Sequence, residues 1–137
     1  MKKTMLLMVG LLLLLPGVGK AEPETRLFLN GQEVVLQKPV YITNGKYFIH
    51  AASLFEAAGL VTVHDSGGKT ITARKEGLEV SQNVGEKTIT SNGRTMAFDT
   101  ASELTEGEVF IPMRMIAFSI NAKFERDGSD LKLFLAE

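Results

Sequence analysis

The clearest hydrophobic pattern of the chain lies in residues 109–121, where a short apolar run passes into a helical repeat. The run at 109–111 is typical of a buried strand. Pro112 suits the first position of a helix, because the N–H that proline lacks would make no hydrogen bond within the helix there. Apolar residues then recur at the spacing of one helical face: Met113, Ile116, Ala117 and Ile120. Asn121 tolerates the left-handed conformation that often ends a helix, so a short helix is expected here.

The same pattern occurs 62 positions earlier, in residues 47–59. A helix is expected over residues 50–58, and Gly59 sits where helices are commonly stopped. Its apolar face consists of Ala51, Leu54, Phe55 and Ala58. The sequence pattern therefore predicts two short helices, each preceded by an apolar strand.

Asn-Gly pairs between apolar runs predict three hairpins, because both central residues of a type I′ turn need positive φ. The pairs are Asn30-Gly31, Asn44-Gly45 and Asn92-Gly93. A further hairpin is expected from strands 60–64 and 70–73 about the turn at 65–69, and residues 77–84 predict a weak strand.

Several positions with demanding geometry match at the constant offset of 62, which indicates an internal repeat. The matched pairs include Asn30 and Asn92, Gly45 and Gly107, Phe48 and Phe110, Gly59 and Asn121, and Asp65 and Asp127. We predict an α+β fold of two tandem units, about 26–75 and 88–137. Each unit is a hairpin, a strand, a short helix and a hairpin, forming antiparallel sheet packed on the two helices.

Residues 1–21 have the layout of a secretory signal peptide. Lys2 and Lys3 precede an apolar stretch at 4–15, and Gly19-Lys20-Ala21 offers small residues before a cleavage point. About a dozen apolar residues are too few for a membrane anchor, since a bilayer core needs roughly 20. We expect residues 22–137 to form one exported domain that is secreted or extracellular. In one variant of this hypothesis the domain is associated with the cell wall. No membrane-spanning segment is expected after cleavage.

Charge and cysteine content exclude several classes of function. The net charge is −1, and removal of residues 1–21 would take away lysines and no acidic residue, which makes the exported chain more negative. Since no basic run is present, nucleic acid is not an expected partner. The absence of cysteine excludes a disulfide scaffold and thiolate metal sites.

The sequence offers few residues for metal binding or redox chemistry. His50 and His64 are separated by a predicted helix and strand and show neither a His-x-His nor a His-x-x-x-His spacing, so we expect no metal and no cofactor. Tyr41 and Tyr47 flank a hairpin turn and are expected to pair across strands instead of forming a quinone.

Hydrolytic chemistry has candidates, but each has a structural alternative. Ser53 follows His50 closely, yet no Gly-x-Ser-x-Gly elbow surrounds it, so a polar helix start is the favoured interpretation. The acidic residues that could form a glycosidase pair lie in a polar connection or at a Gly-Ser turn, where Asp is favoured by local hydrogen bonds. They are Glu103, Glu106, Glu108, Asp127 and Asp130.

Arg114 is the most suggestive single charge, because an arginine in the first turn of a helix opposes the macrodipole and needs a compensating partner. One interpretation is recognition of a carboxylate or a glycan. The favoured alternative is an internal pair or hydrogen bonds to loop carbonyls, for example in the 103–108 segment.

Five motifs follow one another along the chain: an Asn-Gly turn, an apolar strand, Ile111-Pro112-Met113-Arg114, an apolar helix and residues 122–128. This order resembles that of the copper amine oxidase N-terminal-like domain, also called the stalk domain. The resemblance covers residues 26–135. It implies an α+β, non-catalytic domain of exported bacterial proteins, often attached to the cell envelope, whereas the copper site of the named enzyme lies elsewhere in a much larger chain. The family commonly has Trp where this chain has His64 and Arg126.

The expected function is therefore an exported non-catalytic module that mediates cell-envelope attachment or protein–protein contact. Expected partners are an envelope protein, the cell wall or a second copy of the chain. The alternatives are a peptidoglycan- or carbohydrate-binding module, which the absence of Trp weakens, and a small secreted hydrolase. No catalytic, cofactor-binding or metal residue is predicted, and the binding residues stay unassigned.

Overall fold

The computed structural model describes residues 25–65 and 67–136, and all structural statements concern these residues. The expected signal peptide of residues 1–21 lies outside them. The described chain contains two helices, α1 (Ala51–Ala57) and α2 (Met113–Ser119). It contains thirteen strands: β1 (Arg26–Leu29), β2 (Gln32–Glu33), β3 (Tyr41–Thr43), β4 (Lys46–His50), β5 (Val61–His64), β6 (Thr70–Lys75), β7 (Leu78–Asn83), β8 (Thr88–Ser91), β9 (Arg94–Ala97), β10 (Glu103–Thr105), β11 (Glu108–Pro112), β12 (Ala122–Asp127) and β13 (Asp130–Leu135).

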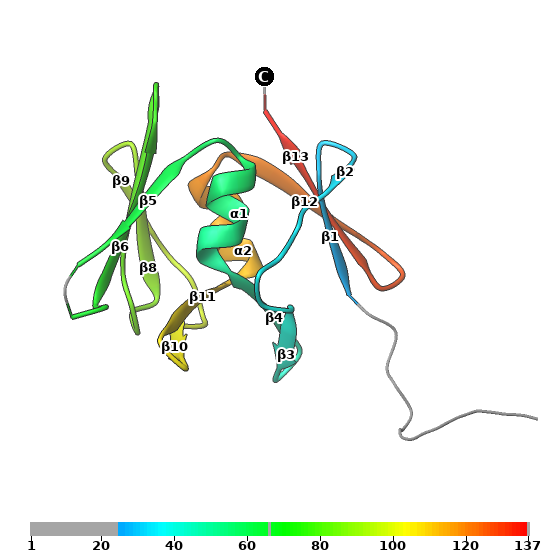
Figure 1. Cartoon of the computed structure of the whole chain (residues 1–137), viewed down its shortest axis with the longest axis horizontal. Coiled ribbons are helices and arrows are strands. Elements are labelled where there is room, and N and C mark those ends of the chain that lie inside the picture. Colours follow the sequence, from blue (N-terminus) through cyan, green and yellow to red (C-terminus); the bar gives the residue numbers. More distant parts are fainter. Residues whose placement is uncertain (1–24, 66, 137) are drawn as a thin grey trace, which may run out of the picture.

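These strands form three sheets around the two helices. The helices lie between an outer sheet of order β5-β6-β7-β8-β9 and another of order β12-β13-β1-β2, and the sheet β10-β11-β4-β3, called the lower sheet below, lies beneath them in the view of Figure 1. Two helices with mostly antiparallel sheets confirm the α+β class. One pair departs from the expected antiparallel sheet, because β1 pairs with β13 in parallel.

The Asn-Gly turns have the backbone that their sequence predicts. Asn30, Asn44 and Asn92 have φ of 51°, 53° and 49°, and each following glycine is also at positive φ. A fourth hairpin of this kind, with Glu106 at 53° and Gly107 at 81°, joins β10 to β11. Residues 103–108 are therefore a hairpin and not a polar connection. Since all three residues of β10 are exposed, no apolar alternation reveals this edge strand in the sequence.

Both helices begin immediately at the end of a buried strand. Pro112 is the last residue of β11 and precedes the helix with φ −56° and ψ 143°, and His50 is likewise the last residue of β4, so both expected helix starts are one residue too early. The predicted faces of both helices are buried, and Met115 is fully buried as well, because α2 contacts elements on more than one side. Gly59 at 90° and Asn121 at 58° confirm the predicted helix ends.

The hairpins that follow the helices cross to strands from the other half of the chain. Hairpin β5–β6 joins hairpin β8–β9 through β7, which is the strand expected within residues 77–84. Hairpin β12–β13 joins β1, which places Leu27 opposite Leu131 and Leu29 opposite Leu133, all of them buried. The first and last strands of the described domain are therefore neighbours, and the core is continuous across both halves.

Within the described residues, no helix is long and apolar enough to cross a membrane.

The hairpin turns generate a stability prediction. Gly31 and Gly93 have φ of 86° and 82°, and a Cβ at either position would meet no atom within 4 Å. Gly31→Ala and Gly93→Ala should each lower the free energy of unfolding by about 1–2 kcal/mol through backbone strain alone. The control is Gln32→Ala, since Gln32 lies beside the first turn, is exposed on β2 and is not at positive φ. Denaturant unfolding measures all three variants, and equal midpoints for Gly31→Ala and Gln32→Ala would contradict the prediction.

Candidate functional site

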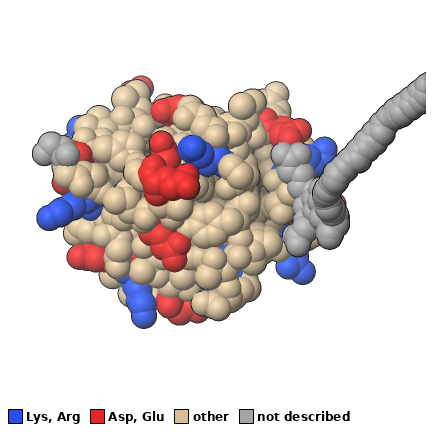
Figure 2. Space-filling view, turned by 60° about the horizontal axis from the view of Figure 1, so that its bottom comes forward, with Lys and Arg blue, Asp and Glu red and all other residues tan. Residues whose placement is uncertain are grey.

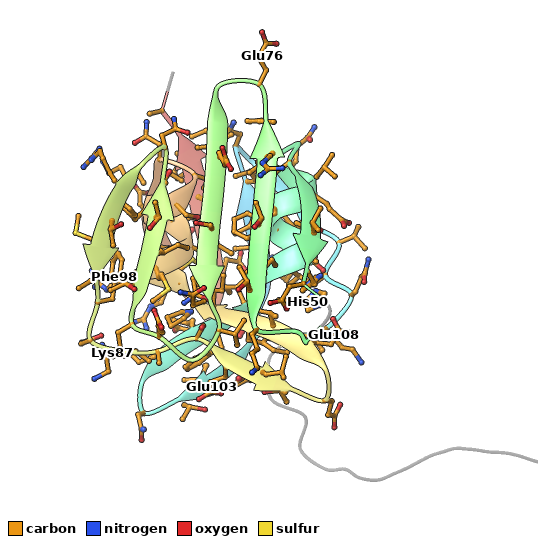
Figure 3. The ribbon with its side chains drawn as sticks, turned by 90° about the vertical axis from the view of Figure 1, so that its left-hand side faces the viewer. His50, Glu76, Lys87, Phe98, Glu103 and Glu108 are labelled. Carbon is orange, nitrogen blue, oxygen red and sulfur yellow. The ribbon has the colours of Figure 1, made fainter. Side chains whose placement is uncertain are left out.

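A buried hydrogen-bonded chain of Ser53, His50 and Glu108 lies where α1 meets the lower sheet. The Nδ1 atom of His50 is 2.7 Å from the Ser53 hydroxyl oxygen, and its Nε2 atom is 2.6 Å from a Glu108 carboxylate oxygen. His50 is 1% exposed and Ser53 4% exposed, whereas Glu108 reaches solvent. Figure 3 shows His50 and Glu108 together at one side of the molecule, with Phe98 on the opposite side.

The electrostatics of this chain favour an ionised Glu108. The hydrogen bond from His50 is the main cause that holds the pKa of Glu108 below its ordinary value of 4.5, and burial opposes this shift. Because the folded-state pKa is lowered, the contribution to stability is present at neutral pH and disappears as the pH falls through that pKa.

The chain contains the three residue types of a serine-hydrolase triad, but its geometry is that of a structural link. The Ser53 hydroxyl accepts the backbone N–H of Gln37 at 2.9 Å, so one of its lone pairs is occupied by the protein itself. Nucleophilic catalysis needs that oxygen free to attack a carbonyl and needs donors aimed at the oxyanion. The bonds instead connect three segments, namely the linker at Gln37, the start of α1 and the start of β11.

The other acidic candidates are each engaged separately. Glu103 accepts a bond from Tyr41 at 2.5 Å, Asp127 pairs with Lys132, and Asp130 pairs with Arg26. Glu106 occupies a turn position at positive φ. Asp127 and Asp130 lie opposite each other where β12 turns into β13, but each carboxylate pairs with its own cation. The Asp65 side chain accepts the N–H of Lys69 at 2.7 Å, which is the local turn bond that its sequence position predicts.

Tyr41 and Tyr47 lie opposite apolar residues and not opposite each other. The register places Tyr41 opposite Phe48 and Tyr47 opposite Ile42, so the two rings are on opposite faces of the sheet. The Tyr41 ring stacks on Phe48 with centroids 5.0 Å apart. The pKa of Tyr41 lies above 10.0, mainly because of burial and next because its hydroxyl donates to the Glu103 carboxylate.

Metal-ligand chemistry gains no support from the tertiary structure of the described part of the chain. No group of three or more His, Asp or Glu side chains there is arranged to hold a metal ion. Both ring nitrogens of His50 are already bonded, and His64 is exposed at the end of β5.

The second candidate is a groove on the other side of the molecule, beside α2. The groove has a volume of about 310 Å³. Its lining comes from the β3–β4 turn, the segment after β9, the start of α2 and strand β12. The residues that decide its chemistry are three cations and three aromatic side chains: Lys46, Arg114, Arg126, Tyr47, Phe98 and Phe124.

Arg114 is exposed in this groove and has no ion pair or hydrogen bond with any described residue. The expected internal pair, or hydrogen bonds to loop carbonyls, in the 103–108 segment is therefore wrong. The reason is geometric, because β10 and the Glu106-Gly107 turn form a hairpin at the edge of the lower sheet, and there Glu103 bonds Tyr41 and Glu108 bonds His50.

Sequence reasoning singled out Arg114 but missed the residues that surround it. Lys46, Phe98 and Arg126 come from three segments that are distant in the sequence, and only the fold of the lower sheet and of β12 brings them to one place. The single signal in the sequence was Arg126, where the resembling family commonly has an apolar Trp.

The charges on the face shown in Figure 2 are mixed, with acidic and basic side chains interspersed and no broad patch of either sign among the described residues. This face therefore lacks the electrostatic footprint expected for nucleic-acid binding.

The hydrogen-bonded chain of Ser53, His50 and Glu108 predicts that replacing the two histidines has different effects on stability. His50→Ala would leave Ser53 and Glu108 without their shared partner and should lower the free energy of unfolding by about 2–3 kcal/mol. His64→Ala, at an exposed position, should change it by less than about 0.5 kcal/mol. Thermal or denaturant unfolding measures both variants, and similar effects of the two would contradict a structural role of the buried chain.

The Tyr41 contact predicts a late ionisation. The chain has two tyrosines and no tryptophan, so the difference in ultraviolet absorbance between wild type and Tyr41→Phe isolates one phenol. Since its folded-state pKa is raised, this phenol should ionise above pH 10.0, and its contribution to stability should be lost as the pH rises through that pKa. A difference titration centred at or below 10.0 would contradict the Glu103 contact.

Comparison with family models gives one match, to the copper amine oxidase N-terminal domain, over residues 28–135. Comparisons with curated proteins and with solved structures give no match. The matched model describes the N-terminal domain, which is a non-catalytic module, and not the catalytic domain. It spans β1 to β13 and so includes both helices, all three sheets and the groove. The chain belongs to the copper amine oxidase N-terminal domain family.

Proposed function

We propose that this protein is an exported, non-catalytic module that mediates cell-envelope attachment or protein–protein contact. The observation that carries the proposal is the position of the exposed apolar side chains. Ile42 on β3, Leu104 on β10, and Val61 and Val63 on β5 are between 51% and 69% exposed. All three strands are terminal strands in the order of their sheets.

Terminal strands with apolar side chains are natural sites for a partner. An edge strand presents unpaired N–H and C=O groups, to which an extended segment of another protein can add as a further strand. Val61 and Val63 point to the same face of β5 because successive side chains alternate, so they form a short apolar strip beside that edge. A partner strand would gain both backbone hydrogen bonds and apolar contact there.

We also infer that the module is a tandem repeat, as its sequence predicts. The starts of β1, β3, β4 and α1 precede the starts of β8, β10, β11 and α2 by the same offset of 62 in residue number. Each half has four strands, a helix and two further strands, and β7 connects them. The halves differ in the last hairpin, because the turn between β12 and β13 is shorter than the turn between β5 and β6. Two units would provide two similar sets of edges.

The absence of turnover is part of the proposal and is supported by the state of the polar residues. The Ser53 hydroxyl is bonded on both sides, and the candidate carboxylates pair with separate partners. One open site of the described chain is the groove beside α2, whose lining is cationic and aromatic. Such a lining suits binding better than acid–base chemistry.

The carbohydrate-binding alternative has weaker support. A site for neutral sugars presents aromatic platforms together with free acceptors and donors for the hydroxyl groups. The one carboxylate in the groove, Asp99, already accepts bonds from Lys46 at 3.0 Å and from Thr100 at 2.9 Å. Few acceptors are left there for sugar hydroxyls.

A cross-linking experiment in living cells tests the proposal. A photo-cross-linking amino acid replaces Ile42 in one variant and Val63 in another, and the control replaces Glu76. Glu76 lies in the β6–β7 turn and points away from the body of the protein (Figure 3). We expect a defined protein or wall adduct from at least one edge position and none from the turn position, read by mass spectrometry.

Two outcomes would contradict the proposal. Identical adduct patterns from the edge positions and from Glu76 would mean that the edges have no selective partner. Release of soluble fragments from labelled sacculi by the purified protein, abolished by Ser53→Ala or Glu108→Gln in a folded variant, would make the hydrolase the better account.

A further inference from the structure

The groove beside α2 carries an excess of positive charge on a protein whose net charge is negative. Lys46, Arg114 and Arg126 line it together with one acidic residue, Asp99. Asp99 pairs with Lys46, so the two arginines have no carboxylate partner among the described residues. A second hollow shares Lys46, Phe98, Asp99 and Arg114 and extends the same charged surface outward.

Two of the three cations of the groove, Arg126 and Lys46, are held in place before any ligand arrives. The Arg126 guanidinium donates to the Tyr47 hydroxyl at 3.0 Å, which occupies one of its five N–H groups and leaves the others available. Lys46 is held by Asp99, which also accepts from Thr100. Preformed donors of this kind reduce the ordering that binding an anion would otherwise require.

The walls of the groove are apolar and supported from behind. Phe98 packs against Phe118 with ring centroids 6.0 Å apart, and Phe118 lies on α2. Met113, which lies at the start of α2, is almost fully buried beneath the groove, and the partly buried ring of Phe124 forms the wall on the β12 side. A ligand that fits must therefore combine an anionic group with an apolar group next to it.

We propose that this groove binds the C-terminal carboxylate of a polypeptide whose last residue is apolar. Arg114 and Arg126 bind the terminal carboxylate, since a guanidinium matches a carboxylate with two parallel hydrogen bonds. The last side chain lies among Phe98, Phe124 and Tyr47. A volume of about 310 Å³ is at the lower end for ligand pockets, which suits a chain end better than an internal segment.

This inference rests on the proposed binding function, because it names the ligand of one surface of the module. It differs from strand addition at β3, β5 or β10, which uses backbone groups and not the arginines. Either surface can therefore fail its test while the other passes.

Fluorescence anisotropy with the purified protein and labelled hexapeptides tests the inference. Four probes share a Gly-Ser leader and end in Ala, Leu, Phe or Tyr, and each is made as the free acid and as the C-terminal amide. We expect the free acids with large apolar ends to bind about tenfold more tightly than their amides, with an affinity that falls as salt is added. Arg114→Gln and Arg126→Gln should each weaken binding of the free acids by about tenfold.

The control variant is Arg74→Gln, which also removes one positive charge. Arg74 forms an exposed ion pair with Glu79 on the sheet that contains β6 and β7, away from the two arginines of the groove. This variant should bind the free acids within about twofold of wild type, because a remote surface charge is screened at physiological salt. Arg114→Lys keeps the charge without the planar fork and should give intermediate affinity. Circular dichroism establishes that each variant is folded.

Four results would overturn the inference. The first two are that no free acid binds at about 1 mM, a very weak affinity, and that acids and amides bind equally well. The other two are that folded Arg114→Gln binds as tightly as wild type, and that an acidic oligosaccharide such as oligogalacturonate binds more tightly than every peptide acid. The last result would assign the groove to an anionic glycan. The cross-linking outcome at Ile42 and Val63 is independent of all four, so failure here does not imply failure of the module's binding role.

Discussion

The antiparallel pairing of β4 with β11 is the contact on which the rest of the structure depends. Ile49 and Ile111 lie opposite each other in this pair, and both are fully buried. Each strand passes without a loop into its helix, so the pairing also sets where α1 and α2 begin. A shift of one residue in this register would turn the buried side chains of one strand to the wrong face and displace the helix that follows it.

The crossing of hairpins between the halves makes the domain depend on both ends of its chain. Hairpin β12–β13 pairs with β1, at the other end of the described chain, and not with the other strands of its own half. Pairing at such a sequence distance requires the intervening chain to be folded first or at the same time, because closing a long loop costs entropy before contacts are gained. We therefore regard residues 26–135 as one cooperative unit and not as two independent units joined by β7.

Two clusters of polar residues in the described chain differ in how far the fold satisfies them. Those at the junction of β4, α1 and β11 satisfy one another: the linker at Gln37, the serine and histidine at the start of α1 and the glutamate of β11 form one buried chain. Those beside α2 are satisfied only in part: Lys46 pairs with Asp99 and Arg126 bonds Tyr47, but the two arginines have no carboxylate partner among the described residues. A buried chain stabilises the fold, whereas arginines without carboxylate partners over an apolar floor are available to a ligand. This contrast is why the groove, and not the Ser–His–Glu chain, is the candidate for recognition.

Local geometry and family membership could be predicted from the sequence because the forces and motifs behind them are local. Positive φ at Asn-Gly pairs, the helix ends at Gly59 and Asn121 and the apolar helix faces follow from a few adjacent residues. Strand β10 escaped prediction because an exposed edge strand needs no apolar alternation. Only the tertiary structure decided which distant segments meet, as in the parallel pairing of β1 with β13, the bond between His50 and Glu108 and the gathering of cations beside α2. Periodicity determines which face of an element is apolar, but many pairings of such faces satisfy it equally. The choice among them depends on how all the elements fill one core, which is a property of the whole fold and not of any local segment.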